Sequence, residues 1–434
     1  MAQFNSAHNA FYEKYDISPR YGFLTEPRDP PGLPAEFDMF AEIFANLGNT
    51  DGKYYRKLVD DLALLNHPQE FYINLAKKQP REVQKQVYAM FTFMVQQYVR
   101  CLGKAMQLDT IPYEIGLIWH HTAETFKLPT VTTYMTVALT NWRLLDPSKP
   151  LTFDNCDAIM ACSGTEDERW FYRVHIGIES IGAQVLRQMH DVEETMATLE
   201  SSQEFLVLLQ KVLVDIRDTL LRMREGCDPE RYWNYVRIFL GGYTADTGLP
   251  DGLNIRGTEI KEIKFGGGSA AQSSLIQAFD EFLGVEHPSD RARDFLRQQR
   301  SYMPERHVAY LQALGAHRSV RDLVMAYDNE LLTEQYNAVM RAFGKFRATH
   351  YAIVHQYVVK FINSAIEKHD SGDLDGAAEI NKNNIYGNKG AGGMVLKMLD
   401  EYRGDVMKMQ IPQGGAAVQE ERDEEMVTAD AEDA

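Results

Sequence analysis

The residues with the clearest capacity for chemistry are His350 and Arg347, which lie three positions apart. Both fall on a stripe of large or apolar residues at helical spacing within residues 333–368, so they point from neighbouring turns of one buried helix face. A buried guanidinium needs an anion, and a neutral imidazole can ligate a metal. A haem would satisfy both, because its iron accepts an axial histidine and its propionates accept an arginine. The alternative is a core histidine bonded to a carbonyl group and an arginine paired with an aspartate.

Two further positions are candidates for ligand contacts. His175 lies four residues after Phe171 on a predicted helix, which places an imidazole beside an aromatic ring. This pair suits a ligand pocket, or His175 lies at the exposed edge of an amphipathic helix. Arg237 lies among the aromatic residues of segment 229–240, where it could bind a carboxylate with its fork of donors or stack as a cation over a ring.

Two segments are rich in glycine. Residues 264–270 read KFGGGSA and residues 387–393 read GNKGAGG. Glycines before a helix that begins at Ser269 could let backbone N–H groups face an anion or let a flat ligand approach closely. The first segment matches neither a P-loop nor a dinucleotide fingerprint, so a plain flexible loop is the simpler interpretation. The second is either a mobile linker or a lid that closes on a substrate.

Helices are the elements that would position these residues. Apolar residues recur at helical spacing, and there is no repeat, sustained strand alternation or βαβ unit, so the predicted fold class is all-α. The predicted helices cover residues 37–47, 54–65, 69–77, 81–102, 112–126, 131–142, 168–199, 202–225, 229–240, 269–283, 289–303, 307–314 and 333–368. We expect four parts: an extended N-terminal arm (1–35), a small helical domain (36–145), a large helical domain (146–412) and an acidic, disordered tail (413–434).

Composition narrows the classes of partner. The 434 residues hold 45 basic and 62 acidic side chains, a net charge of −17, which argues against nucleic acid as a partner. The four cysteines lack CxxC spacing, so neither a zinc site nor a disulfide framework is indicated. The polar first residues lack the apolar run of a signal peptide, and no apolar stretch is long enough to cross a membrane. We therefore expect a cytoplasmic protein that is not bound to a membrane.

Several segments together resemble one family, the indoleamine 2,3-dioxygenases, which are haem enzymes that open the indole ring of tryptophan with O₂. In chain order the segments are LPTVTTY…NW at 128–142, VRIFLGG at 236–242, GGGSAAQSS at 266–274, FDEFLGV at 279–285, RSYMPERH at 300–307, FRATHYAIV at 346–354 and GAGG at 390–393. They occur in family order and at family spacing, and the resemblance extends over about residues 15–399.

The resemblance implies a fold, a cofactor and a set of site residues. The family fold is a small helical domain that caps a larger helical haem domain. The cofactor is haem b, with His350 as the iron ligand and Arg347, supported by Asp280, as the partner of a propionate. The implied site residues are catalytic His175, Phe171 and Ser269; substrate-binding Arg237, Tyr134, Tyr232, Ala270, Gly392 and Gly393; cofactor-binding Arg347, Asp280 and Gly268; and the iron ligand His350.

The chain departs from the family pattern in two places. His175 stands where the best-known members have a small hydroxyl residue, and Ala391 and Met394 stand where the pattern has threonines. The resemblance implies cleavage of the indole C2–C3 bond of L-tryptophan, or of a close analogue, to an N-formylkynurenine-type product, the first step of tryptophan catabolism by the kynurenine route. The reaction needs O₂ and a reductant for the haem. The alternatives are a haem oxygenase of the same fold that acts on another aromatic amino acid or inserts one oxygen, and a haem-binding sensor with little turnover.

Overall fold

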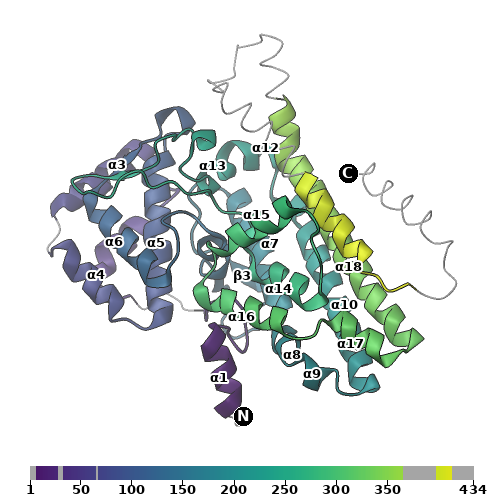
Figure 1. Cartoon of the computed structure of the whole chain (residues 1–434). Helices are drawn as coiled ribbons and strands as arrows, with labels where there is room; N and C mark the ends of the chain where they lie inside the picture. Colours follow the sequence, from purple (N-terminus) through teal and green to yellow (C-terminus); the bar gives the residue numbers. More distant parts are fainter. Residues whose placement is uncertain (1–5, 28–32, 65–66, 365–396, 413–434) are drawn as a thin grey trace.

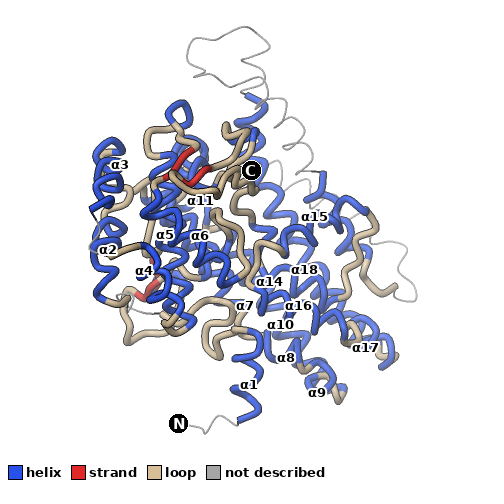
Figure 2. Tube along the Cα trace, turned by 60° about the vertical axis from the view of Figure 1, so that its left-hand side comes forward, coloured by secondary structure: helices blue, strands red, loops and turns tan. Residues whose placement is uncertain are grey.

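The protein is built almost entirely from helices, which confirms the predicted all-α class. A computed structural model describes residues 6–27, 33–64, 67–364 and 397–412. In this part of the chain the strands are short and lie at the periphery of the helical body (Figure 2). The predicted acidic tail, residues 413–434, lies outside the described residues.

The first group of elements runs from the N-terminus to residue 144. It comprises α1 (Ser6–Tyr15), η1 (Ala35–Phe37), α2 (Asp38–Ala45), α3 (Gly52–Asp60), η2 (Asp61–Leu64), α4 (Gln69–Lys77), α5 (Arg81–Arg100), η3 (Lys104–Met106), β1 (Thr110–Ile111), α6 (Tyr113–Phe126), η4 (Met135–Leu139) and β2 (Arg143–Leu144). The segment predicted as an extended arm therefore includes a helix, α1, that its sequence did not reveal.

The second group holds most of the candidate site residues. It comprises η5 (Phe153–Asn155), β3 (Cys156–Asp157), α7 (Glu166–Gly182), α8 (Leu186–His190), α9 (Val192–Thr195), α10 (Leu199–Leu221), α11 (Met223–Gly226), α12 (Pro229–Arg231), η6 (Tyr232–Val236), α13 (Arg237–Leu240), η7 (Ala245–Thr247), β4 (Asn254–Ile255), η8 (Ala270–Gln272), α14 (Ser274–Leu283), α15 (Asp290–Arg300), α16 (Glu305–Ala316), α17 (Val320–Tyr327), α18 (Glu330–Val354) and η9 (His355–Val359). A further helix covers residues 397–408.

Helix α5 is the centre of the first group. Nearly every residue from Val87 to Arg100 is buried, so this helix is enclosed on all sides rather than on one stripe. Helices α2, α3, α4 and α6 pack around it, on the left of Figure 1. The parallel pair of β1 with β4 ties this group to the later part of the chain.

Helices α10 and α18 form the most extensive helix pair of the second group, and α7 packs on α10. The Asn329 side chain caps α18 by accepting a hydrogen bond from the backbone N–H of Leu332. The predicted helix 333–368 thus begins earlier, at Glu330, and after Val354 it continues as the π-helix η9. Residues 365–368 lie outside the described residues.

The predicted helix 168–199 is wrong in its second half. Helix α7 ends at Gly182, and the chain turns before the short helices α8 and α9. At Gly182 the backbone lies directly on α14, where an added Cβ would be 2.9 Å from Cγ of Leu275. The helix ends at the residue that makes this contact, and apolar periodicity does not reveal such a contact.

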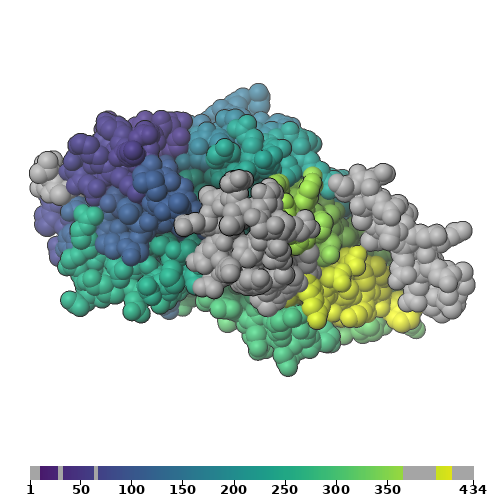
Figure 3. Space-filling model, turned by 90° about the horizontal axis from the view of Figure 1, so that it is seen from above, coloured from purple at the N-terminus to yellow at the C-terminus, as the bar shows by residue number. Residues whose placement is uncertain are grey.

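The C-terminal helix, residues 397–408, lies along α18 in both Figure 1 and Figure 3, where it is yellow beside the green of α18. Asn337 of α18 holds the end of this segment by two hydrogen bonds with the backbone of Ile411, of 2.8 and 2.9 Å. The last described segment is therefore part of the helical body.

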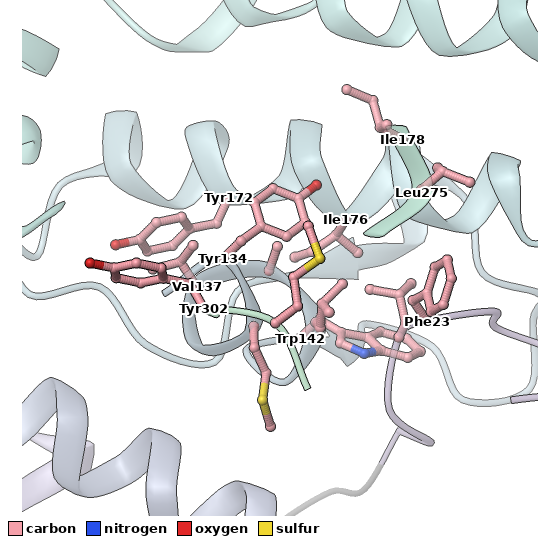
Figure 4. Close-up of a cluster of buried hydrophobic side chains, with 14 of the residues drawn as sticks. Phe23, Tyr134, Val137, Trp142, Tyr172, Ile176, Ile178, Leu275 and Tyr302 are labelled. Atoms are coloured by element: carbon pink, nitrogen blue, oxygen red, sulfur yellow. The ribbon is translucent and has the colours of Figure 1, made fainter. Parts of the chain in front are cut away.

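Buried side chains from both groups form one continuous cluster, and Figure 4 shows the part around Tyr134, Tyr172 and Trp142. The division at residues 145 and 146 therefore stays a proposal. None of the described helices combines the length and the apolar character needed to span a lipid bilayer.

Candidate functional site

A cavity between α7, α14 and α18 holds the candidate residues. The space inside it that is open to water-sized molecules is about 80 Å³. It is lined by Tyr134, His175, Ile178, Leu220, Ala270, Ala271, Ser273, Ile276, Gln277, Asp280, Leu296, Phe346, Arg347, His350, Leu399 and Tyr402. Six of the thirteen residues that the sequence singled out therefore meet at one cavity: Tyr134, His175, Ala270, Asp280, Arg347 and His350.

His350 reaches the cavity from the middle of α18. Its ring is parallel to that of Phe346, with an interplanar angle of 8° and centroids 6.5 Å apart. Burial lowers the pKa of His350 to about 4, and the nearby His175 and Arg347 act in the same direction. The ring is therefore neutral at pH 7. Among the described residues no group hydrogen-bonds to it, so its nitrogen lone pair remains available to a ligand.

Arg347 lies one turn before His350 and is buried with Asp280 of α14. Its Nη2 donates to both carboxylate oxygens of Asp280. The guanidinium also lies over the rings of Phe343 and Tyr402, at 4.7 and 5.4 Å from their centroids. Burial raises the pKa of Asp280, but Arg347 and His287 together outweigh this effect, and the net pKa lies below the usual value. The arginine–aspartate pair that we considered as the alternative is thus present.

His175 lies on the cavity wall and not on an exposed helix edge. Its Nδ1 is 2.8 Å from the carbonyl oxygen of Phe171, and because a carbonyl only accepts, Nδ1 carries the proton. Burial lowers the pKa of His175, so the ring is neutral at pH 7. Its Nε2 is then a hydrogen-bond acceptor.

Aromatic rings connect His175 to the segment that carries Arg237. The ring of Phe171 is 4.5 Å from that of His175 and 5.1 Å from that of Tyr232, measured between centroids. Tyr134 contacts His175 edge-on at 5.8 Å. Arg237 follows Tyr232 by five residues, in α13, and its guanidinium lies 4.9 Å from the ring centroid of Trp233. In the described part of the chain no carboxylate forms an ion pair with Arg237.

The first glycine-rich segment, residues 264–270, packs closely against the backbone of residues 240–242. An added Cβ at Gly267 would lie 2.7 Å from the backbone nitrogen of Gly242, so only glycine allows this approach. The N–H of Gly268 donates to the Leu240 carbonyl at 3.0 Å, and Ser269 caps η8 rather than α14. Of the three predicted residues here, only Ala270 lines the cavity.

Gly392 and Gly393, predicted to bind substrate, lie outside the described residues, as do Ala391 and Met394. The structure thus tests the first glycine-rich segment and leaves the second as a prediction.

Comparison with known proteins gives the family. The model of a family described as indoleamine 2,3-dioxygenase matches residues 11–408. The chain belongs to the indoleamine 2,3-dioxygenase family. It is 31% identical to the human protein named indoleamine 2,3-dioxygenase 2 over 352 residues, which are 80% of this chain and 84% of the human one. It is 29% identical to the Saccharomyces cerevisiae indoleamine 2,3-dioxygenase over 378 residues, 81% of each chain.

The proteins similar to this chain include one with another name. A protein of Haliotis madaka named myoglobin is 25% identical to this chain over 353 residues, 80% of this chain and 88% of that protein. Similarity over most of the chain is therefore compatible with more than one named role.

The residues that line the cavity of this indoleamine 2,3-dioxygenase family member have the chemistry to hold a haem. His350 offers a neutral ring nitrogen, and Nε of Arg347 is buried without a hydrogen-bond partner among the described residues. The walls between them are apolar, with Ile178, Leu220 and Ile276. A flat, mostly apolar group with one metal and one anionic edge matches this arrangement.

The prediction from sequence missed Glu179, which lies four residues after His175 on α7. Its side chain is buried, and its Oε1 accepts a hydrogen bond of 2.8 Å from Ser273. Its Oε2 has no partner within the described residues. Burial raises the pKa of Glu179 to about 7, although Ser273 and Tyr134 lower it in part. The four-residue spacing from His175 is a signal that could have identified it.

Proposed function

We propose that this protein is a haem-dependent dioxygenase that cleaves the indole C2–C3 bond of L-tryptophan, or of a close indole analogue, and places both atoms of O₂ in the product. The observation that carries the proposal is the meeting of His350, Arg347 and His175 at one buried, largely apolar cavity. Family membership agrees with it.

The cofactor would be held by two residues of α18. His350 would ligate the iron through its neutral imidazole, and Arg347 would bind a propionate through the edge of the guanidinium that Asp280 leaves open. The haem, when bound, supplies the oxygen chemistry, and a separate reductant supplies its electrons. The protein contributes ligation and a cavity that excludes water.

The substrate would be oriented by the aromatic rings of Phe171 and Tyr232 and by two polar residues, His175 and Arg237. The rings of Phe171 and Tyr232 offer stacking surfaces to an indole. Nε2 of His175 can accept a hydrogen bond from the indole N–H, because Nδ1 already donates to Phe171. Arg237 is a cation without an ion-pair partner in the described chain, which suits the carboxylate of an amino acid.

The test is a product measurement. The purified protein is loaded with haem, reduced and mixed with L-tryptophan and ¹⁸O₂, and the product is analysed by mass spectrometry. We expect an N-formylkynurenine that carries two labelled oxygens. A product with one labelled oxygen would indicate monooxygenation, and turnover of only another aromatic amino acid would reassign the substrate.

The haem ligand is tested with a matched pair of variants. His350→Ala should lose haem or its native spectrum, whereas His355→Ala, five residues later and exposed, should keep both. Full haem content and an unchanged ferrous–CO spectrum in His350→Ala would falsify the ligand assignment.

A second candidate function is reversible O₂ binding without turnover, which the relative named myoglobin favours. A reduced protein that forms a stable O₂ complex and leaves tryptophan unchanged would support this function over the dioxygenase.

A further inference from the structure

Four buried polar side chains beside the cavity contact one another in sequence and form a charged cluster: Arg347, Asp280, His287 and Asp405. Arg347 of α18 binds Asp280 of α14, and Oδ2 of Asp280 lies 3.9 Å from Nε2 of His287 in the loop after α14. On its other side, Nδ1 of His287 donates to Oδ2 of Asp405 at 3.1 Å. Asp405 belongs to the helix 397–408. The side chains of His287, Asp280 and Asp405 are 7%, 9% and 5% exposed, so these groups are shielded from water.

The charges in this cluster are unbalanced when His287 is neutral. Two carboxylates, Asp280 and Asp405, then share one buried cation, Arg347. Nε2 of His287 is buried and has no hydrogen-bond partner among the described residues, although it faces Asp280. Lys408 also approaches Asp405, at 3.3 Å, but its side chain is 72% exposed, so water screens its charge. A proton on Nε2 of His287 would balance the charges and give Asp280 a second donor.

The charged cluster also connects the cavity to the C-terminal helix. Leu399 and Tyr402 of that helix line the cavity, and Tyr402 also lies against His287, with ring centroids 5.0 Å apart. The hydroxyl of Tyr402 donates to the Ala292 carbonyl at 3.2 Å. The helix 397–408 is thus both a wall of the cavity and the source of one partner of His287.

We propose that His287 is a positioning residue for the cofactor, which binds Asp405 and Asp280 in its protonated form and thereby holds Arg347 and the C-terminal helix in place for haem retention. This inference rests on the proposed function, because it requires that the protein binds haem. A propionate at Arg347 would add one negative charge to the cluster and so favour the protonated imidazole.

The groups that face His287 give the expected direction with pH. They are Asp280 of α14, Asp405 and Tyr402 of the C-terminal helix, Arg347 of α18, and Arg293 of α15, which donates to the His287 carbonyl at 2.8 Å. Burial lowers the pKa of His287, but the two carboxylates outweigh it and raise the pKa above 6.5. A raised histidine pKa stabilises the assembled state below the unperturbed pKa, and the effect is lost as the pH rises through the raised value.

The experiment measures haem loss, not activity. The haem-loaded protein is mixed with excess apomyoglobin as haem acceptor, and the rate of haem transfer is followed by absorbance from about pH 6 to about pH 9. For the wild type we expect a rate about tenfold higher at the upper end, the scale of one charged hydrogen bond. His287→Gln and Asp405→Asn should lose haem at the fast rate throughout, with less than about a twofold change with pH.

Two variants separate this role from simple docking of the helix. Arg291→Gln removes the ion pair of 2.7 Å between Arg291 and Glu401, which holds the same helix without touching Asp280. It can raise the rate of haem loss, but its pH profile should match that of the wild type. His317→Gln, at an exposed histidine, should change neither the rate nor the profile.

The outcomes distinguish the two proposals. A wild-type protein that takes up no haem overturns the proposed function itself. A wild-type protein that retains haem, but whose rate of loss does not depend on pH or has the same pH profile as His287→Gln, overturns only the role of His287. Should His287→Gln fail to fold, Asp405→Asn decides between these outcomes.

Discussion

Arg237 is a cation beside an aromatic run, without an ion-pair partner among the described residues. Arg237→Ala should reduce kcat/KM for L-tryptophan. The loss should correspond to roughly 2–4 kcal/mol of transition-state stabilisation, as expected when one partner of a desolvated charged pair is removed. Arg231→Ala is the matched control, because that arginine is largely exposed and pairs with Asp167. Tryptamine lacks the carboxylate, so its turnover should be the same in Arg237→Ala and the wild type. An equal loss for both substrates would contradict a contact with the carboxylate.

His175 has one free ring nitrogen, and the hydrogen bond to Phe171 makes it an acceptor. His175→Ala should therefore lower kcat/KM for tryptophan by about 1–2 kcal/mol, the scale of one buried hydrogen bond, while haem content is unchanged. The substrate 1-methyltryptophan has no indole N–H, so the variant and the wild type should turn it over at similar rates. A larger loss for 1-methyltryptophan than for tryptophan would exclude the proposed hydrogen bond.

Glu179 should destabilise the protein at neutral pH. Its pKa is raised to about 7, so the unfolded chain is ionised between about pH 4.5 and 7 while the folded carboxyl is still protonated. Glu179→Gln keeps the acceptor for Ser273 and should raise the free energy of unfolding by about 1–3 kcal/mol at about pH 8. Urea unfolding of the apoprotein measures this gain, which should vanish below about pH 4.5. A gain of the same size at both pH values would show a packing effect and not a charge effect.

At the scale of elements, most helices could be predicted because apolar periodicity is a local property of the sequence. Helix α18 and the Asn329 cap follow from residues within a few turns of each other. The close contact of Gly182, at the end of α7, with Leu275 could not be predicted in this way, because Leu275 is distant in sequence. The same holds for the short helices α8 and α9, which depend on where the chain turns.

The contact at Gly182 gives a prediction for the helix pair α7 and α14. Gly182→Ala would place a methyl group against the buried side chain of Leu275, and overpacking of this kind costs about 1–3 kcal/mol. Gly404→Ala is the control, since nothing lies within 4 Å of a Cβ at that helical position, and it should be neutral or slightly stabilising. Thermal unfolding of both variants measures the difference. An unchanged stability in Gly182→Ala would show that Leu275 can move away at little cost.

At the scale of the whole molecule, the candidate site joins segments that lie far apart in the sequence. The pair of His350 and Arg347 could be identified from one helix, and Arg237 and His175 from their aromatic neighbours. The meeting of His350, Arg347 and His175 at one cavity depends on the fold, and before the structure only the resemblance to a family grouped them in one site. The bond between His287 and Asp405 spans 118 residues and belongs to no motif, so no pattern in the sequence indicated it.

His307 also connects distant segments, and its protonation should weaken the whole assembly. Its buried ring lies 3.3 Å from the Asp16 carbonyl, in the N-terminal segment, and 3.3 Å from Oγ of Ser274 on α14. The side chain of Asp16 pairs in turn with Lys85 of α5. The ring of His307 thus lies where three parts of the protein meet, and a charge there would be costly to bury.

Burial lowers the pKa of His307 to about 4, although Asp16 opposes this shift. The unfolded chain takes up the proton near pH 6.5 and the folded protein only near pH 4, so stability falls as the pH drops through this window. The glutamine of His307→Gln does not titrate. Between about pH 7 and pH 4 the free energy of unfolding should therefore fall by up to about 3 kcal/mol less in this variant than in the wild type, as measured by urea unfolding of the apoprotein. The exposed His317→Gln should retain the full loss. If both variants lose stability equally with acid, a group other than His307 is responsible for the loss.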